Sequence, residues 1–338
     1  MLIRLCLEKS ELTVIGTILS SILSAAFLGA ILRVTTPILL PSLGALISDR
    51  AGVINIGLEG IMLSAAFTGV MVTAYTKDVP PWFALLLGFV AALVVAVLLA
   101  LLLAFFHLHL KGDLILGGVA INILGSAGTA ALMYQFTGER GYTSKLPSLT
   151  MPTVDLAFLK PIIGDALYTI FGNQNLMTWI AFIAVAAVWF MMYRMPVGKH
   201  LRAVGENPEA AASVGINVRR MRYLALALSG VLAGLGGIYM SMGYLSLFQR
   251  DMTSGRGFIA LATPALGNGT PFGTMLASIL FGAFYALSIR LGTLQIPPQL
   301  PEIIPYASTV IALVVYSWQR GRAANRRARQ FQKQMESG

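Results

Sequence analysis

An uninterrupted apolar segment, from Trp82 to Phe106, contains no charged side chain. A helix needs about 20 apolar residues to cross the hydrocarbon core of a bilayer, so this segment alone is long enough. Charged residues make up only 11% of the chain and hydrophobic residues 57%, whereas a soluble domain carries about 25% charged residues. The sequence therefore predicts an all-α polytopic membrane protein.

Eight apolar runs are long enough to be full spans, and two more are too short to cross alone. The long runs are 12–32, 57–76, 82–106, 114–136, 177–195, 222–248, 272–290 and 303–319. The short runs, 36–48 and 255–267, contain or adjoin Pro and Gly, and we expect half-helices or strongly broken spans there. Broken backbone at membrane depth is tolerated only under protein or in a water-filled cavity. If both short runs cross, about ten transmembrane elements result.

Basic residues gather in short loops and at the C-terminus, which accounts for the net charge of +10 without nucleic-acid binding. Cytoplasmic loops are rich in Lys and Arg, so the loop at 196–220 and the tail at 321–338 are predicted to be cytoplasmic. The loop at 137–176, whose charges nearly balance, then lies outside. One transmembrane domain over 1–320 results, with both termini in the cytoplasm. The run at 12–32 exceeds the ~7–15 residues of a signal-peptide core, so it is read as an uncleaved first span.

A weak internal repeat pairs the two short runs. In each half of the chain a long run, a short broken run and two long runs follow one another. Corresponding interruptions in two halves point to a substrate path near the midplane, although Gly and Pro are common in membrane helices in any case. The two halves would run in the same direction, so the repeat would be parallel.

Polar residues occur among apolar spans in the segment from Ser48 to Gly60. Asp49 and Arg50 are interpreted as a surface salt bridge. Asn55 and Glu59 are four residues apart and share a face if the segment is helical. Intramembrane polar groups are costly and usually face a pathway or a partner, so these two residues either line a substrate path or make structural hydrogen bonds.

Three further residues are candidates for the path: Asn122, Phe258 and Asn268. Aromatic faces can stack on a planar base, and amides can bond its edge. Another group of residues, Gly230, Gly234 and Gly237, is assigned to helix packing, because small residues let helices approach closely in lipid.

The motifs of several enzyme classes are missing. The sequence contains no phosphate-binding loop of the Gly-x-x-x-x-Gly-Lys-Ser/Thr type, no metal-ligand cluster and no Gly-x-Ser-x-Gly nucleophile turn. No span carries the chain of acidic and His residues expected of a proton relay. The chain is therefore not expected to be an enzyme, to bind a cofactor or a metal, or to hydrolyse ATP, and energy for transport would come from a partner chain.

A polar, helix-forming segment at 198–217 separates two apolar runs and is flanked by basic residues. Its residues from Arg202 to Ala211, with the later Gly215-Ile216, resemble the cytoplasmic coupling loop of permease subunits of bacterial ABC importers, in the simple-sugar and nucleoside branch. The segment 52–60 is similar to the signature of the shorter permease of nucleoside-type pairs, and 118–124 and 257–262 match in type and order. Residues 263–269 depart from the family pattern, which leaves the substrate open.

The resemblance implies an assembly in the bacterial cytoplasmic membrane. Two permease subunits, often two different homologous chains, would form the path, above ATPase subunits that bind ATP and Mg. A periplasmic or lipid-anchored binding protein would deliver the solute. Six residues are assigned to coupling with the ATPase: Arg202, Glu206, Asn207, Glu209, Ala210 and Gly215.

The expected function is import of a nucleoside or a related sugar- or base-bearing solute. The alternatives are an ion-coupled secondary transporter, a permease for a simple sugar or for another nucleoside-like solute such as a flavin, and a membrane-embedded enzyme, which the missing catalytic motifs disfavour.

Overall fold

The computed structural model describes residues 24–76, 78–143, 149–157, 160–292, 303–314 and 316–318. Its elements in chain order are α2 (Ala25–Arg50), α3 (Leu58–Tyr75), α4 (Pro81–Leu108), α5 (Leu114–Ile123), the π-helix η1 (Leu124–Gly128), α6 (Thr129–Thr137), β1 (Thr153–Asp155), α7 (Lys160–Phe171), β2 (Asn173–Asn175), α8 (Leu176–Arg194), α9 (Pro196–Glu206), α10 (Pro208–Ser213), α11 (Val218–Ile238), the π-helix η3 (Tyr239–Tyr244), α12 (Arg256–Leu266) and α13 (Pro271–Gly292). Residues 303–314 and 316–318 are also helical.

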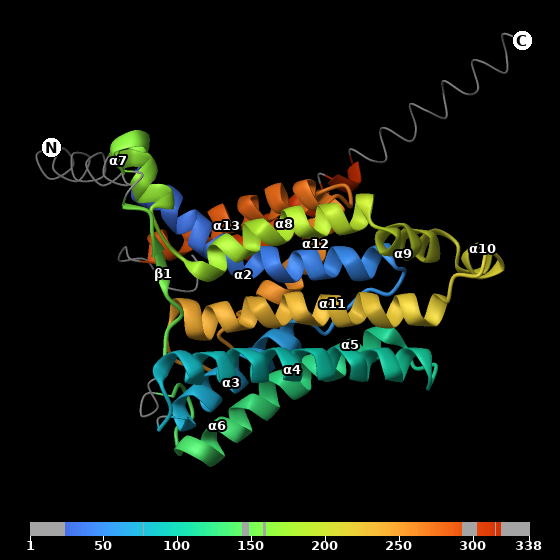
Figure 1. Ribbon diagram of the computed structural model, residues 1–338, viewed down its shortest axis with the longest axis horizontal. Helices are drawn as coiled ribbons and strands as arrows, with labels where there is room; N and C mark the ends of the chain where they lie inside the picture. Colours follow the sequence, from blue (N-terminus) through green and yellow to red (C-terminus); the bar gives the residue numbers. More distant parts are fainter. Residues whose placement is uncertain are drawn as a thin grey trace, which may run out of the picture.

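Most of these helices lie side by side along one direction, with α9 and α10 at one end of the bundle and β1 and α7 at the other (Figure 1). Seven helical segments of the described residues are long and apolar enough to cross a membrane. They are α2, α3, α4, the continuous α5–η1–α6, α8, the continuous α11–η3, and α13. The all-α polytopic class is therefore confirmed in its main lines, while the count of ten elements stays a prediction.

The helices begin where local chemistry starts a helix. The side chain of Asp113 caps α5, Asn175 caps α8 and Asn217 caps α11, each accepting a hydrogen bond from a backbone N–H of the first turn. These caps satisfy N–H groups that have no partner inside the helix. Capping residues at the ends of apolar runs explain why the predicted boundaries of these spans agree with the structure to within a few residues.

The predicted break at 36–48 is wrong, because this run is the second half of the continuous helix α2. Pro37 removes the hydrogen bond to the carbonyl four residues earlier, which normally kinks or ends a helix. That carbonyl belongs to Arg33, and the Tyr239 hydroxyl donates to it at 3.0 Å. A side chain from η3 thus replaces the missing backbone donor.

The predicted first span at 12–32 partly overlaps α2. Its residues 12–23 lie outside the described part of the chain, as does the predicted tail.

Two interruptions of the helical pattern remain among the apolar elements. The chain between α2 and α3, residues 51–57, is not helical although most of it is buried. The second short run is helix α12 of 11 residues, which is about 16 Å long and much shorter than the ~30 Å hydrocarbon core. The interruption in the first half therefore lies about ten residues later than expected, next to the Asn55–Glu59 motif.

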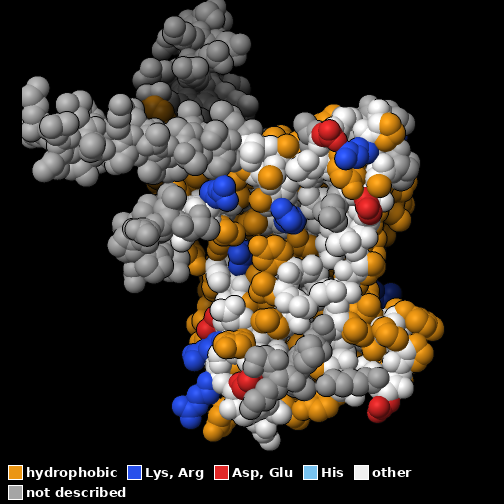
Figure 2. Space-filling view, turned by 90° about the vertical axis from the view of Figure 1, so that its left-hand side faces the viewer, with side chains coloured by type: hydrophobic (Ala, Val, Ile, Leu, Met, Phe, Trp, Pro, Cys, Tyr) orange, Lys and Arg blue, Asp and Glu red, His pale blue; other side chains and the backbone are white. Residues whose placement is uncertain are grey.

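A small sheet lies in the predicted outside loop at 137–176. Strands β1 and β2 pair antiparallel, with Thr153 opposite Asn175 and Asp155 opposite Asn173, an element that the all-α prediction did not include. The space-filling view of this end of the molecule shows both basic and acidic side chains on it (Figure 2). This mixture agrees with the near balance of charge in the loop sequence.

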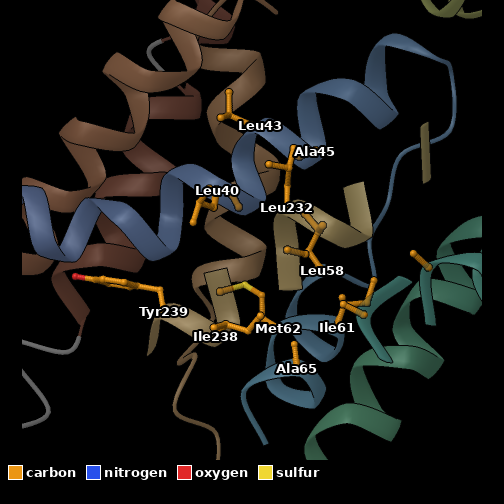
Figure 3. Packing of buried hydrophobic residues seen from close by; sticks show 14 of the residues in the cluster. Leu40, Leu43, Ala45, Leu58, Ile61, Met62, Ala65, Leu232, Ile238 and Tyr239 are labelled. Atoms are coloured by element: carbon orange, nitrogen blue, oxygen red, sulfur yellow. The ribbon is translucent and has the colours of Figure 1, made fainter. Parts of the chain in front are cut away.

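The core lies between α2, α3 and α11, whose side chains point toward one another in Figure 3. The labelled members are Leu40, Leu43, Ala45, Leu58, Ile61, Met62, Ala65, Leu232, Ile238 and Tyr239. Helix α4 covers this core with a stripe of small buried residues at every fourth position: Ala84, Gly88, Ala92, Ala96, Ala100 and Ala104. Large side chains project outward on its opposite face: Leu86, Val90, Val94, Leu98 and Leu102.

The three glycines assigned to packing all lie at close helix contacts. A Cβ atom on Gly230 would lie 2.5 Å from the Ala100 Cβ, and one on Gly234 would lie 2.6 Å from the Ala96 Cβ. At Gly237 a Cβ would overlap the carbonyl oxygen of Met62. Helices α4 and α3 can approach α11 this closely only where the side chains are minimal.

Candidate functional site

The nonhelical connection at 51–57 is held in place by Asn55, which is fully buried. The Asn55 amide nitrogen donates to Ser229 Oγ of α11 at 3.0 Å, and its side-chain oxygen accepts from the Gly57 N–H at 3.1 Å. The Asn55 backbone N–H donates to Ser48 Oγ. Both polar atoms of the Asn55 side chain thus have hydrogen-bond partners within the protein, and this residue does not line the cavity described below.

Asn122 of the neighbouring helix α5 caps the N-terminal end of α3. Its side-chain oxygen accepts from the Gly60 N–H at 2.8 Å, and its amide nitrogen donates to the Ile56 carbonyl at 2.9 Å. The Gly60 N–H lies in the first turn of α3, where backbone donors have no partner inside the helix. The residue preceding α3, Gly57, has no side chain that could cap it, so Asn122 supplies the cap across the helix interface.

Glu59 holds the start of α12. One carboxylate oxygen accepts from the Thr253 hydroxyl at 2.6 Å and from the Gly255 N–H at 2.8 Å, and the other accepts from the Gly257 N–H at 2.6 Å. A negative charge at a helix N-terminus is favoured by the helix dipole and by the free N–H groups there. A Cβ on Gly257 would lie 2.6 Å from the Glu59 Oε2, so this glycine is needed for the contact.

A cavity of about 620 Å³ opens beside this junction. It brings together three of the five residues predicted to line a path, namely Glu59, Asn122 and Phe258. The remaining wall consists of Leu63, Val119, Ile123, Ser126, Ala127, Asp251, Ser254, Gly255 and Tyr306. Phe258 has 49% of its surface exposed and borders the cavity.

Two polar residues of the cavity were missed by sequence reasoning. Asp251 accepts a hydrogen bond from the Ser126 hydroxyl at 2.5 Å, and it has a positive φ of 51°. Tyr306 donates from its hydroxyl to the Ser254 carbonyl at 2.8 Å. An acidic residue at the start of a turn that ends in Ser-Gly was a usable signal for Asp251, whereas nothing near Tyr306 in the sequence points to α12. The cavity thus offers an aromatic face, a carboxylate and hydroxyl groups within mostly apolar walls.

Asn268 lies away from this cavity, just beyond the other end of α12, and is exposed. Its carbonyl oxygen and that of Gly269 accept hydrogen bonds from the Arg50 guanidinium, with Gly269 at 3.0 Å from Nε and 2.6 Å from Nη2. The predicted salt bridge between Asp49 and Arg50 is wrong: among the ion pairs of the described residues it does not occur. Arg50 instead joins the end of α2 to the end of α12.

The predicted coupling segment consists of two helices, α9 and α10. Asn207 caps α10 by accepting from the N–H groups of Glu209 and Ala210. Gly215 has a φ of +87° and ends the segment with hydrogen bonds from 215 to 212 and from 216 to 211, the arrangement of a glycine C-cap. These local signals were all readable from the sequence.

Helix α10 projects from the end of the bundle (Figure 1). Glu206, Glu209 and Ala210 are exposed, and Val214 has 74% of its surface exposed although it is apolar. Arg202 lies against α8, with its guanidinium 4.8 Å from the centre of the Tyr193 ring. A short capped helix with an exposed apolar tip is suited to contact with another protein.

The same segment contacts the end of α2 and the start of the nonhelical connection. A Cβ on Gly205 of α9 would overlap the Arg50 carbonyl oxygen, and one on Gly52 would lie 3.4 Å from the Gly205 Cα. Backbone therefore packs on backbone where α9 meets the end of α2. The coupling segment is thus in direct contact with Arg50, one of the two residues that hold α12.

Comparison with known proteins agrees with this arrangement. Residues 27–313 match the family described as branched-chain amino acid transport system, permease component. The chain is 36% identical over 296 residues to the guanosine ABC transporter permease protein NupQ of Bacillus subtilis, covering 84% of this chain and 89% of NupQ. It is 32% identical over 290 residues to the nucleoside ABC transporter permease protein NupC of Lactococcus lactis, covering 83% and 89%.

A putative glucose ABC transporter permease protein of Haloferax volcanii, TsgC13, is 32% identical over 311 residues, covering 86% of this chain and 91% of that protein. More distant likeness extends to a second permease from each of the two bacteria, NupB of Lactococcus lactis at 23% identity and NupP of Bacillus subtilis at 26%. The resemblance inferred from the sequence motifs is thereby confirmed. The chain belongs to the permease family of branched-chain amino acid transport systems, as a relative of ABC transporter permease subunits.

Proposed function

We propose that this chain is the transmembrane subunit of an ATP-driven ABC importer and forms part of the translocation path for a nucleoside. The observation that carries the proposal is the likeness, over more than four fifths of the chain, to permeases named for nucleosides and for guanosine. The cavity beside α12 supports it. The exposed Phe258 ring can stack on a planar base, and the Asp251 carboxylate can accept hydrogen bonds from sugar hydroxyls.

Energy enters from a separate ATPase chain, which binds ATP and Mg. The exposed α10, capped by Asn207, with Glu209 and Ala210 in its first turn and Gly215 beyond its end, docks on that ATPase. Arg202 and Glu206 of α9 belong to the same coupling surface. The support is the projection of α10 and its capping at both ends. Because α10 lies on the ATPase side, this end of the bundle faces the cytoplasm. The basic residues near both ends of the sequence support cytoplasmic termini.

A second, homologous permease completes the path. The pairs NupB with NupC and NupP with NupQ, all similar to this chain, support a heterodimer. A periplasmic or lipid-anchored binding protein delivers the solute at the end of the bundle that carries β1 and α7. The assembly lies in the bacterial cytoplasmic membrane, and this chain takes no part in nucleic-acid binding.

Reconstituted transport tests the proposal. The permease pair, the ATPase and the binding protein are placed in liposomes, and uptake of labelled guanosine, glucose and riboflavin is measured with and without internal ATP. Guanosine uptake that requires ATP is expected. Uptake of glucose or riboflavin in its place would contradict the nucleoside assignment, and glucose is the better-supported rival because TsgC13 is named for it.

The same liposomes test the other rivals. An ion-coupled secondary transporter would accumulate solute in a proton or sodium gradient with this chain alone and without nucleotide. Chemical turnover of the solute by this chain alone would favour a membrane-embedded enzyme. Either result would overturn the importer assignment.

A further inference from the structure

Helix α12 is gripped at both of its ends by two residues that flank one nonhelical connection. Glu59 follows this connection and binds the N-terminal end of α12 through Thr253, Gly255 and Gly257. Arg50 precedes it and binds the carbonyls of Asn268 and Gly269, beyond the C-terminal end. The charges match the helix dipole, since the carboxylate meets the N-terminus and the guanidinium meets the C-terminus.

Glycines make both contacts possible. At the N-terminal end a Cβ on Gly257 would come within 2.6 Å of the Glu59 carboxylate, and at the other end a Cβ on Gly269 would overlap the Arg50 guanidinium. Gly269 also has a φ of +62°, a backbone angle that residues other than glycine rarely adopt. The backbone of α12 is thus shaped to receive Glu59 and Arg50 at once.

Helix α12 is short and packs on α2 and α13. Its first turn carries Phe258 in the cavity wall. Its C-terminal end is attached to Arg50, whose carbonyl oxygen packs on the Gly205 backbone of α9. A displacement of α9 therefore acts on Arg50 first, and the rigid charge-assisted hydrogen bonds transfer it to α12.

We infer that Arg50 and Glu59 act as positioning residues that form a two-ended clamp on α12, through which movement of the α9–α10 segment reaches the Phe258 wall of the cavity. This inference rests on the proposed function, because it requires that α10 is moved by an ATPase. Coupling in this sense needs an element with two positions that both sites influence, and α12 held by the clamp is that element. Neither Arg50 nor Glu59 needs to contact the solute for this role.

The test uses the complete reconstituted assembly with two variants. Glu59→Gln keeps the shape of the side chain, and Arg50→Gln shortens it. Each variant loses one charge and at least one charge-assisted hydrogen bond to α12. Uptake per ATP hydrolysed is expected to fall about tenfold or more, the change that corresponds to losing one such bond, while ATP hydrolysis continues. The double variant is expected to be no worse than the poorer single variant, because both act on the same helix.

A reporter on α12 separates transmission from mere structural damage. In a Cys6→Ser background, Ala265→Cys places a thiol on the exposed face of α12, and its rate of reaction with a water-soluble maleimide is read from the labelled peptide with and without ATP. In the parent assembly ATP is expected to change this rate. With Arg50→Gln or Glu59→Gln the ATP-dependent change is expected to disappear.

Matched controls carry the same chemistry at other helix ends. Asp113→Asn removes a carboxylate that caps α5, and Arg194→Gln removes a guanidinium from the last turn of α8; both are expected to keep parental uptake and the reporter response. If Arg50→Gln does not assemble, Arg50→Lys keeps the charge but not the fork of donors, and a reduced reporter response is still expected.

The outcomes distinguish the two proposals. A parental reporter response in both clamp variants, with parental uptake, would overturn the clamp and leave the importer assignment standing. A parent assembly that shows no ATP-driven uptake would overturn the proposed function and the clamp together.

Discussion

Replacing Asn122 with Ala should destabilise the protein, because both polar atoms of this side chain are used inside it. The variant leaves the Gly60 N–H and the Ile56 carbonyl without the bonds of 2.8 Å and 2.9 Å that they now make. A buried donor or acceptor left unpaired costs about 1–3 kcal/mol. Asn122 also borders the cavity, so water can reach part of the site, and a total of about 2–4 kcal/mol is expected.

The assay is thermal unfolding of the purified chain in detergent, scanned at one fixed rate because unfolding of such proteins is often irreversible. For a chain of this size about 2 °C corresponds to 1 kcal/mol, so the midpoint is expected to fall by about 4–8 °C. The control is Val119→Ala, one turn earlier on α5 and 42% exposed in the same cavity. It changes the cavity wall without removing a hydrogen bond, and a loss below about 1 kcal/mol is expected.

Two results would refute this reasoning. If Asn122→Ala unfolds at the parental temperature but shows a changed KM for solute, Asn122 acts as a binding residue and not as a cap for α3. If Val119→Ala lowers the midpoint as much as Asn122→Ala does, the loss comes from altered packing of α5 and not from the hydrogen bonds.

Three further changes test other parts of the structure. Tyr239→Phe removes the donor to the Arg33 carbonyl; the unfolding midpoint is expected to fall by the equivalent of about 1–3 kcal/mol, and an unchanged midpoint would refute the account of how α2 tolerates Pro37. Gly237→Ala is expected to lower the yield of folded protein in size-exclusion chromatography, because its Cβ would overlap the Met62 carbonyl, whereas Gly141→Ala, with no atom within 4 Å of the added Cβ, should behave as the parent. Glu209→Arg reverses an exposed charge at the N-terminus of α10 and is expected to abolish uptake while ATP hydrolysis and folding are retained; unchanged uptake would rule out α10 as the coupling helix.

Local signals explain most of what could be predicted. The long apolar runs at 57–76, 82–106 and 177–195 became α3, α4 and α8, because a span depends on its own length and composition and on capping residues next to it. The short α12 was also predictable, since too few residues lie between its glycines to cross the bilayer. The capped α10 follows from Asn207, Pro208 and Gly215, which act within a few residues of each other.

The roles of the polar residues could not be predicted in the same way. Asn55, Glu59 and Asn122 were grouped because polar side chains in apolar spans need partners, and the sequence does not say which partners they have. Asn55 binds a residue 174 positions away, Glu59 one 194 positions away and Asn122 one 66 positions away. Only the packing of the helices decides whether such a partner is protein or solute.

By itself the sequence determined that this chain crosses a membrane many times and where a polar segment must leave the membrane, because hydrocarbon excludes charge and unpaired backbone wherever they occur. Its motifs also determined which family it resembles. The tertiary structure alone decided that α2 continues through Pro37 and Pro41, that the interruption lies at 51–57 and that Arg50 and Glu59 hold α12. The continuation through Pro37, the buried connection at 51–57 and the hold on α12 each involve a donor or acceptor supplied by a distant helix. Such a partner is set by how the helices pack and not by the neighbouring sequence.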